Sequence, residues 1–307
     1  MEIIRSTTDF PERLRGGALT IGNFDGVHLG HARIVERLTE FAKKVSGSAI
    51  VFTFEPHPVR LLRPDVAPPP LTWTERKAEL LAELGVDALV AYPTNEKLLA
   101  KTPQEFFEEI ICQLLSAKAV IEGPNFFFGR NRTGTVETLR QFCQQAGIAF
   151  DIVQPLQISG EMASSSRIRQ LIAEGEVAEA AKMLTKPYRI RGIVTHGAGR
   201  GAKIGFPTAN LEGIDTLIPA DGIYAGWAII ADQCLPAAIH IGPNPTFGEQ
   251  RQKTEVYILD YHGALYGQPL EVDFVSRLRG IVTFENAGEL VSQMKKDVEQ
   301  VRSILKT

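Results

Sequence analysis

The first half of the chain alternates short apolar runs with segments whose apolar residues recur every three or four positions. The apolar runs predict strands at 18–21, 48–54, 86–92, 117–122 and 148–154. The periodic segments between them predict helices at 29–45, 74–84, 102–116 and 135–146. This repeated strand–helix order predicts an α/β fold, with a doubly wound, Rossmann-like parallel sheet.

The pattern changes near 183–188, where helical periodicity gives way to short strands separated by Gly, Pro and Asn turns. The expected strands lie at 188–195, 222–231, 235–241, 254–261 and 270–278. With no helix between them, these strands predict a small, closed antiparallel β-barrel. The last segment, 285–306, predicts one long helix with an apolar face for the barrel. We therefore divide the chain into domains of residues 1–184 and 185–307.

Composition narrows the class of protein. The chain has 307 residues, enough for two hydrophobic cores, and its 44% hydrophobic and 22% charged residues are typical of globular proteins. A net charge of −3 argues against nucleic-acid partners. We expect no signal peptide and no membrane span, and a cytoplasmic protein whose three scattered cysteines are reduced. The sequence does not indicate an oligomeric state.

A glycine-rich turn joins the first predicted strand to the first long helix. It reads Gly-Asn-Phe-Asp-Gly-Val-His-Leu-Gly-His over 22–31. Such a turn presents backbone N–H groups and the positive end of a helix, which suits a phosphate chain. His28 and His31 are three positions apart, so in a first helical turn both rings face one way and can stabilise charge on phosphorus. We expect both histidines to be catalytic. The ligand-binding residues expected in the same turn are Gly22, Asn23, Phe24, Asp25 and Gly26.

The histidine pair also has two plainer interpretations, a solvated surface position and one half of a zinc site. No cysteine or further histidine lies nearby at ligand spacing. The coincidence of turn, histidine pair and strand–helix context therefore favours phosphate chemistry.

Polar residues also follow two later strands, at the sheet edge where ligands of open α/β sheets bind. His57 lies in the rigid loop Glu-Pro-His-Pro after the second predicted strand, where it either contacts a nucleotide or is solvated. Asn125 lies in the loop 123–134, where it can bond a base or phosphate, and the arginines of that loop either clamp phosphates or are solvated.

A serine cluster, Ser-Ser-Ser-Arg-Ile-Arg over 164–169, opens another predicted helix. Serines at this position commonly serve only to cap the helix. Their hydroxyls and the two arginines can alternatively bind phosphate. The candidate residues are Ser164, Arg167 and Arg169.

The second domain carries one informative loop, His-Gly-Ala-Gly-Arg-Gly-Ala-Lys-Ile-Gly-Phe-Pro-Thr-Ala-Asn over 196–210. Its glycines free backbone N–H groups to wrap a phosphate tail. Thr208 and Asn210 offer hard oxygens two residues apart, which suit Mg²⁺. The alternative is an ordinary barrel loop. The phosphate-binding candidates are Gly197, Gly199, Arg200 and Lys203.

The 22–31 turn resembles the His-x-Gly-His signature of the adenylyl- and cytidylyltransferases, and in its longer form that of the bacterial bifunctional riboflavin kinase/FAD synthetases. The runs around His57 and Asn125 are similar to that family, and 164–169 resembles its Ser-Ser-Thr-x-Ile-Arg motif, with Ser166 in place of threonine. The resemblance implies that this motif meets the nucleotide phosphates opposite the histidines. Phe127 departs from the polar or basic residue common in the family.

The second domain resembles riboflavin kinases in its Gly-Phe-Pro-Thr-Ala-Asn run, in Gly-Pro-Asn-Pro-Thr-Phe-Gly at 242–248 and in Glu255. The resemblance implies that Thr208 and Asn210 hold Mg²⁺ with ATP, and that Glu255 is the general base on the ribityl 5′-hydroxyl. Without the resemblance, Glu255 reads as an edge charge. Arg279 is expected to line the flavin pocket, although Ile281 stands where the family carries glutamate.

The resemblance covers nearly the whole chain and implies a bifunctional enzyme. Riboflavin and ATP would give FMN in the second domain, and FMN and a second ATP would give FAD and pyrophosphate in the first. Two alternatives are an enzyme with one degenerate half, and a flavin-binding regulatory protein without turnover.

Overall fold

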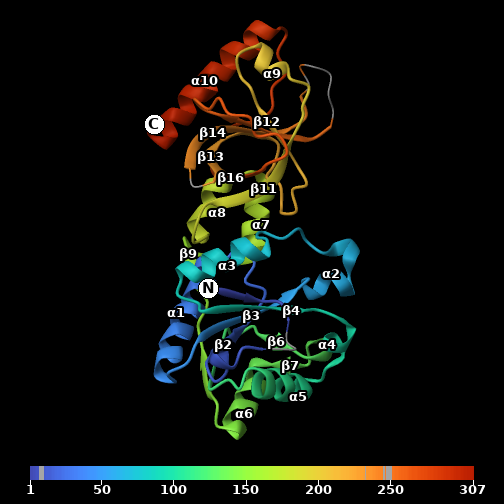
Figure 1. Ribbon diagram of the computed structural model, residues 1–307, viewed down its shortest axis with the longest axis vertical. Coiled ribbons are helices and arrows are strands. Elements are labelled where there is room, and N and C mark those ends of the chain that lie inside the picture. Colours follow the sequence, from blue (N-terminus) through green and yellow to red (C-terminus); the bar gives the residue numbers. More distant parts are fainter. Residues whose placement is uncertain (7–9, 232, 245, 247–250) are drawn as a thin grey trace. The chain divides into compact units, whose positions relative to one another are not determined.

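The computed structural model describes residues 1–6, 10–231, 233–244, 246 and 251–307 (Figure 1). Six parallel strands form the sheet of the N-terminal half. The strand order is β1-β4-β3-β2-β5-β8. The strands are β1 (Glu2–Ile4), β2 (Ala18–Ile21), β3 (Ala49–Glu55), β4 (Ala88–Pro93), β5 (Ala119–Glu122) and β8 (Ala149–Ile152). Five of them lie where the sequence predicts strands, and the parallel sheet is confirmed; only the short edge strand β1 was not predicted.

Helices cover both faces of this sheet, as the doubly wound prediction requires. Successive residues of a strand point to opposite faces, so Ala18 packs with α1 (Leu29–Lys44) and α3 (Thr74–Glu83), and Leu19 packs on the other side. That other side is covered by the π-helix η3 (Phe107–Leu114) and by α6 (Val136–Ala146). The smaller elements are η1 (Glu12–Leu14), α2 (Pro58–Leu62), η2 (Pro64–Val66), α4 (Glu96–Ala100), α5 (Pro103–Phe106), β6 (Phe127–Phe128), η4 (Arg130–Arg132), β7 (Gly134–Thr135), β9 (Gln157–Ile158) and β10 (Glu161–Met162).

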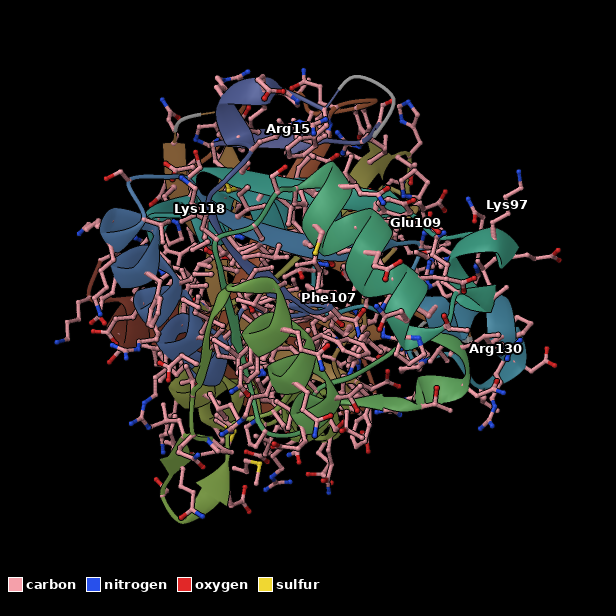
Figure 2. The ribbon with its side chains drawn as sticks, turned by 90° about the horizontal axis from the view of Figure 1, so that it is seen from below. Arg15, Lys97, Phe107, Glu109, Lys118 and Arg130 are labelled. Atoms are coloured by element: carbon pink, nitrogen blue, oxygen red, sulfur yellow. The ribbon has the colours of Figure 1, made fainter. Side chains whose placement is uncertain are left out.

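The helix predicted at 102–116 begins as expected but changes its winding. Thr102 and Glu105 form a capping box at the start of α5. From Phe107 onward the hydrogen bonds reach five residues back, as in the 3.1 Å bond from the Leu115 N–H to the Ile110 carbonyl. The wider π-turn still buries the apolar stripe, with Phe107 inside and Glu109 exposed (Figure 2). The prediction of a helix is confirmed, and the π winding is a feature that the sequence pattern does not indicate.

The C-terminal half contains a closed antiparallel barrel, as predicted. Its strand order is β11-β12-β15-β14-β13-β16. The strands are β11 (Tyr188–Thr195), β12 (Ala209–Glu212), β13 (Gly222–Ile230), β14 (Gln233–Gly242), β15 (Lys253–Ile258) and β16 (Pro269–Arg279). The sequence pattern does not predict β12, which is only four residues long and begins within the last two residues of the predicted phosphate-binding loop 196–210.

Helices pack on the outside of the barrel. The terminal helix α10 (Ala287–Leu305) buries Val301 against Ala225 and Leu259. The single turn α9 (Arg200–Lys203) lies in the glycine-rich loop, which the sequence predicts as irregular. Among the described residues of this half, helices also form at α7 (Ser165–Glu174) and α8 (Val177–Met183).

The chain divides into two compact units, the first of residues 1–68 and 74–164 and the second of 69–73 and 165–307. Helices α7 and α8 therefore belong with the barrel, although the sequence pattern places the domain division at 184/185. Within the second unit, the Ala220 N–H donates to the Ile172 carbonyl, and Ile172 and Val177 are fully buried.

This packing predicts different stabilities for two C-terminal fragments. We expect residues 165–307 to be more stable than residues 184–307, because the shorter fragment uncovers the barrel surface that α7 and α8 bury. The expected difference is about 3 kcal/mol, the burial of one or two large apolar side chains. Urea unfolding followed by far-UV circular dichroism measures it, and equal midpoints for the two fragments would contradict it.

Candidate active sites

The strand order of the parallel sheet marks the position at its carboxyl edge where a ligand is expected to bind. Chain order runs outward in opposite directions from the neighbours β2 and β5, and ligands of such sheets bind at this reversal. β2 pairs with β5 at only two positions, and beyond them the buried Glu122 side chain accepts the Ile21 N–H at 2.6 Å. The turn at 22–31 follows β2 and the loop at 123–134 follows β5, so both begin at this reversal of the strand order.

The two histidines stack on each other at the start of α1. Their ring centroids are 3.6 Å apart, with 20° between the ring planes, and the Phe24 ring lies 4.8 Å from His31. His28 is the N-cap residue with extended backbone, and its Nδ1 accepts the His31 N–H at 3.3 Å. The expectation of two rings facing one way holds, but the cap and not a shared helical turn aligns them. With Nδ1 accepting, the neutral His28 ring carries its proton on Nε2.

Burial keeps both rings neutral. It lowers the pKa of His28 to about 4, against an opposing effect of Asp25. Burial, His28 and Lys77 together hold the pKa of His31 well below its ordinary value. His31 Nδ1 and Asn23 Oδ1 are buried atoms without a hydrogen-bond partner in the described part of the chain. Because buried polar atoms are normally paired, these two atoms indicate a place for a polar ligand.

Lys77 is a charged residue near this site that the sequence analysis missed. It lies on α3, and its Nζ donates to Thr53 Oγ1, which in turn donates to the Asn23 carbonyl. The pKa of Lys77 lies below its ordinary value, because burial lowers it more than the nearby Asp25 and Glu55 raise it. In the sequence it looks like an ordinary lysine of an amphipathic helix, and only the packing of α3 on the sheet brings it near the histidines.

The lowered pKa of His28 predicts that acid destabilises the protein. An unfolded imidazole titrates near 6.5 and the folded one near 4, so between these values the unfolded chain binds more protons. The unfolding free energy therefore falls as the pH drops from 6.5 to 4, by about 3 kcal/mol for this residue. His28→Asn keeps a capping oxygen but cannot titrate, so urea unfolding should depend less on pH in this variant. Identical pH profiles for the variant and the parent would contradict the assignment of this pH dependence to His28.

The other predicted residues of the first unit have mixed placements. Asp25 is buried beside the histidines. His57 caps α2, where its Nδ1 accepts the Val59 N–H at 3.0 Å. Asn125 is exposed in a turn, and the predicted loop that follows it contains the β6–β7 hairpin, in which Arg132 covers the Phe127 ring.

The serine motif is split between the two units. Ser164 ends the first unit, next to Ala163, whose carbonyl lies beside Gly30. Arg167 and Arg169 lie on α7 in the second unit, where Arg169 Nε donates to the Pro69 carbonyl at 3.0 Å. A phosphate-binding role of this motif stays a prediction.

A cavity of about 200 Å³ lies on the outer face of the barrel, under α9 and α10. Ile239, Ile241 and Val256 are fully buried in the barrel, so the residues that alternate with them point outward. Seven predicted residues of the second unit line the cavity. They are Gly197, Gly199, Arg200, Thr208, Asn210, Glu255 and Arg279. Lys203, which was predicted to bind phosphate with them, is not among the described residues that line the cavity.

Strand register arranges four polar residues and one apolar residue of the cavity in one row around the barrel. Asn210 on β12 is paired with Glu255 on β15, and Glu255 is paired with His240 on β14. The row continues through Ile223 on β13 to Arg279 on β16. All five residues line the cavity. Residues far apart in the sequence therefore face one ligand space because the barrel closes.

Glu255 is held as an ionised carboxylate. Burial raises its pKa, but hydrogen bonds from His240 and Asn244 and the nearby Lys253 outweigh this, and the pKa lies below its ordinary value. A general base has to be deprotonated before reaction, so this environment suits that role. The sequence analysis missed His240, because a histidine within an apolar strand gives no sign of its cross-strand partner.

The loop over the cavity fits closely around Asn210. A Cβ at Gly197 would lie 2.3 Å from Asn210 Nδ2, so any other residue there would displace the Asn210 side chain. Thr208 and Asn210 supply a hydroxyl and an amide oxygen, which fit Mg²⁺ bound mainly by substrate phosphates. Among the described residues, no group of three or more His, Cys, Asp or Glu could hold a metal.

An ion pair joins β16 to α10 in the wall of the cavity. Arg279 donates to both carboxylate oxygens of the buried Asp297 on α10, at 2.7–3.2 Å. Ile281, the departure from the family pattern, lines the cavity as an apolar residue. In the motif 242–248, Pro245, Phe247 and Gly248 lie outside the described residues.

Comparisons with known proteins match both halves. The FAD synthetase family model matches residues 10–167, and the riboflavin kinase family model matches residues 184–305. A bifunctional riboflavin kinase/FMN adenylyltransferase of Escherichia coli (strain K12) is 34% identical over 299 residues, 97% of this chain and 96% of that protein. This chain belongs to the bifunctional riboflavin kinase/FMN adenylyltransferase family. A member from Pseudomonas fluorescens is 32% identical over 305 residues, 99% of this chain and 98% of that protein.

The chain thus carries an FAD synthetase domain and a riboflavin kinase domain, which confirms the resemblance seen in the sequence. Because each half matches the family model of its own enzyme, the comparisons support the bifunctional interpretation and not the alternative of one degenerate half. A solved structure titled a macrolide-efflux protein from Streptococcus pneumoniae has a TM-score of 0.86 and 30% identity, over 98% of each chain. That similarity concerns the fold, since a fold alone does not determine function. No helix in the described ranges is long and apolar enough to cross a membrane.

Proposed function

We propose that the two halves catalyse consecutive steps of flavin nucleotide synthesis at separate sites. The barrel transfers the γ-phosphoryl group of ATP to the 5′-hydroxyl of riboflavin, giving FMN and ADP. The first domain transfers AMP from a second ATP to FMN, giving FAD and pyrophosphate. The observation that carries this proposal is that each unit contains its own site of matching chemistry, the stacked histidines in one and the Glu255 row in the other.

In the kinase site, the flavin occupies the cavity between the barrel wall and α10. Glu255 accepts the proton of the 5′-hydroxyl as the oxygen attacks phosphorus. Arg200 and the glycine-rich backbone hold the phosphate tail, and most of the rate enhancement comes from positioning and charge stabilisation. Thr208 and Asn210 would hold Mg²⁺, which supplies positive charge to the phosphates when bound.

In the adenylyltransferase site, no protein base is needed, because the FMN phosphate is already an anion. The neutral rings of His28 and His31 donate N–H groups to the α-phosphate as charge develops in the transition state. Gly22, Asn23 and the start of α1 receive the phosphate chain.

Incubation with riboflavin, ATP and Mg²⁺, followed by chromatography of the flavins, tests the whole proposal. Both FMN and FAD should form with riboflavin as the starting flavin. FMN alone would indicate an inactive first domain, and neither product would indicate a flavin-binding protein without turnover.

Removal of Mg²⁺ provides a further prediction. With excess EDTA we expect both products to be lost, while the circular dichroism spectrum stays unchanged, because Thr208 and Asn210 are neutral residues that need no cation to fold. Turnover in EDTA within a few-fold of the untreated enzyme would contradict the proposed metal.

A further inference from the structure

His240 stands beside the proposed base on the neighbouring strand. Its Nδ1 lies 3.5 Å from Glu255 Oε2, and the two side chains are only 16% and 19% exposed. The residues are cross-strand partners, and both line the cavity. The distance is long for a hydrogen bond, as is common in catalytic sites before substrate binds and tightens them.

A second donor fixes which carboxylate oxygen is engaged. Asn244 Nδ2 donates to the same Oε2 at 3.2 Å. Both contacts fall on one oxygen, so Oε1 is the oxygen left for the substrate hydroxyl. A carboxylate held this way at one oxygen cannot rotate freely, which sets the direction in which Oε1 accepts a proton.

We propose that His240 is a positioning residue of the kinase site, which donates from Nδ1 to Glu255 Oε2 and thereby orients Oε1 toward the riboflavin 5′-hydroxyl. The proposal rests on the proposed role of Glu255 as general base. His240 acts through Glu255 and does not touch the reacting atoms.

The reaction balances without a net change at His240. The hydroxyl oxygen forms a bond to the γ-phosphorus, the bond from that phosphorus to the ADP oxygen breaks with its electron pair leaving on ADP, and the hydroxyl proton moves to Oε1. His240 keeps its Nδ1 proton throughout, and the donated hydrogen bond stabilises the ionised form of Glu255 before transfer.

Loss of this bond should also change the pH dependence. Without the His240 donor the carboxylate is harder to ionise, so the acid limb of FMN formation should move to higher pH. Other titratable or charged groups around the cavity remain in place, and they do not differ between the variants compared below. They are Arg200, Lys253, Tyr257, Tyr266, Arg279 and Asp297.

Three variants separate positioning from packing. His240→Leu removes the donor, and His240→Asn places an amide donor near the position of Nδ1. His262→Leu makes the same change at an exposed histidine outside the cavity wall and serves as the control. We expect kcat for FMN formation to fall about 10–100-fold in His240→Leu, the usual effect of losing a hydrogen bond to a charged group. KM for riboflavin should change much less, His240→Asn should recover most of kcat, and His262→Leu should match the parent.

A spectroscopic measurement on the full-length enzyme completes the test. ¹⁵N spectra of its histidines, with the His240 signals assigned by their loss in His240→Asn, should show the proton on Nδ1. The opposite tautomer, or a kcat and acid limb in His240→Leu equal to those of the parent, would overturn the proposal. Glu255→Gln separates two causes of such a result. If His240→Leu behaves like the parent while Glu255→Gln abolishes FMN formation, only the role of His240 fails. If Glu255→Gln is also active, the assignment of the base itself fails.

Discussion

Glu255→Gln is expected to lower FMN formation by about 10²–10⁴-fold, the usual contribution of general-base catalysis. Glutamine has nearly the same size as glutamate, and its amide oxygen can take the hydrogen bonds that Oε2 receives from His240 and Asn244. The barrel should therefore keep its packing. An amide cannot accept the hydroxyl proton at neutral pH, so the loss should appear in kcat while riboflavin binding weakens little.

The same preparation contains its own control. Supplied with FMN and ATP, it should form FAD at the parental rate, because that reaction uses the other site. Kinase turnover within a few-fold of the parent would exclude Glu255 as the base and leave positioning by Thr208 and Asn210 as the main contribution of the protein.

Loss of either histidine of the stacked pair is expected to lower FAD formation by about 10²–10³-fold, as for one donor to a developing charge. FMN formation from riboflavin should stay nearly unchanged in His28→Ala and His31→Ala. Steady-state assays that start from FMN and from riboflavin measure the two reactions separately.

His28→Ala also removes the cap of α1, which costs about 1 kcal/mol. His28→Asn is the matched control, because asparagine restores the cap acceptor but not the ring donor. Both variants should lose FAD formation. Only the alanine variant should also show a lower free energy of unfolding. If His28→Asn were active, the cap and not the ring would be the contribution of His28.

The sequence predicted those features that depend on local patterns. Strand and helix positions followed from apolar periodicity, and the 22–31 turn was found because its glycines and histidines are adjacent in the chain. The missed elements have weak local signals. β12 is four residues long and follows a proline, so nothing in its sequence distinguishes it from a loop, although it carries Asn210.

The missed side chains depend on register and packing instead. His240 became a candidate only when β14 was paired with β15, and Lys77 only when α3 was packed on the sheet. The domain division shows the same dependence, because α7 and α8 follow the first domain in helical pattern but join the barrel through contacts distant in sequence.

The barrel closes through its shortest strand. β12 meets β15 at only two paired positions, whereas β13 and β14 are paired along nine. Backbone amides at so narrow a junction exchange with solvent through local opening, below the free energy of global unfolding. A substrate that touches Asn210 on one strand and Glu255 on the next binds only the closed junction, so it slows that opening by mass action. Deuterium uptake at these two positions therefore reports directly whether the kinase site is filled.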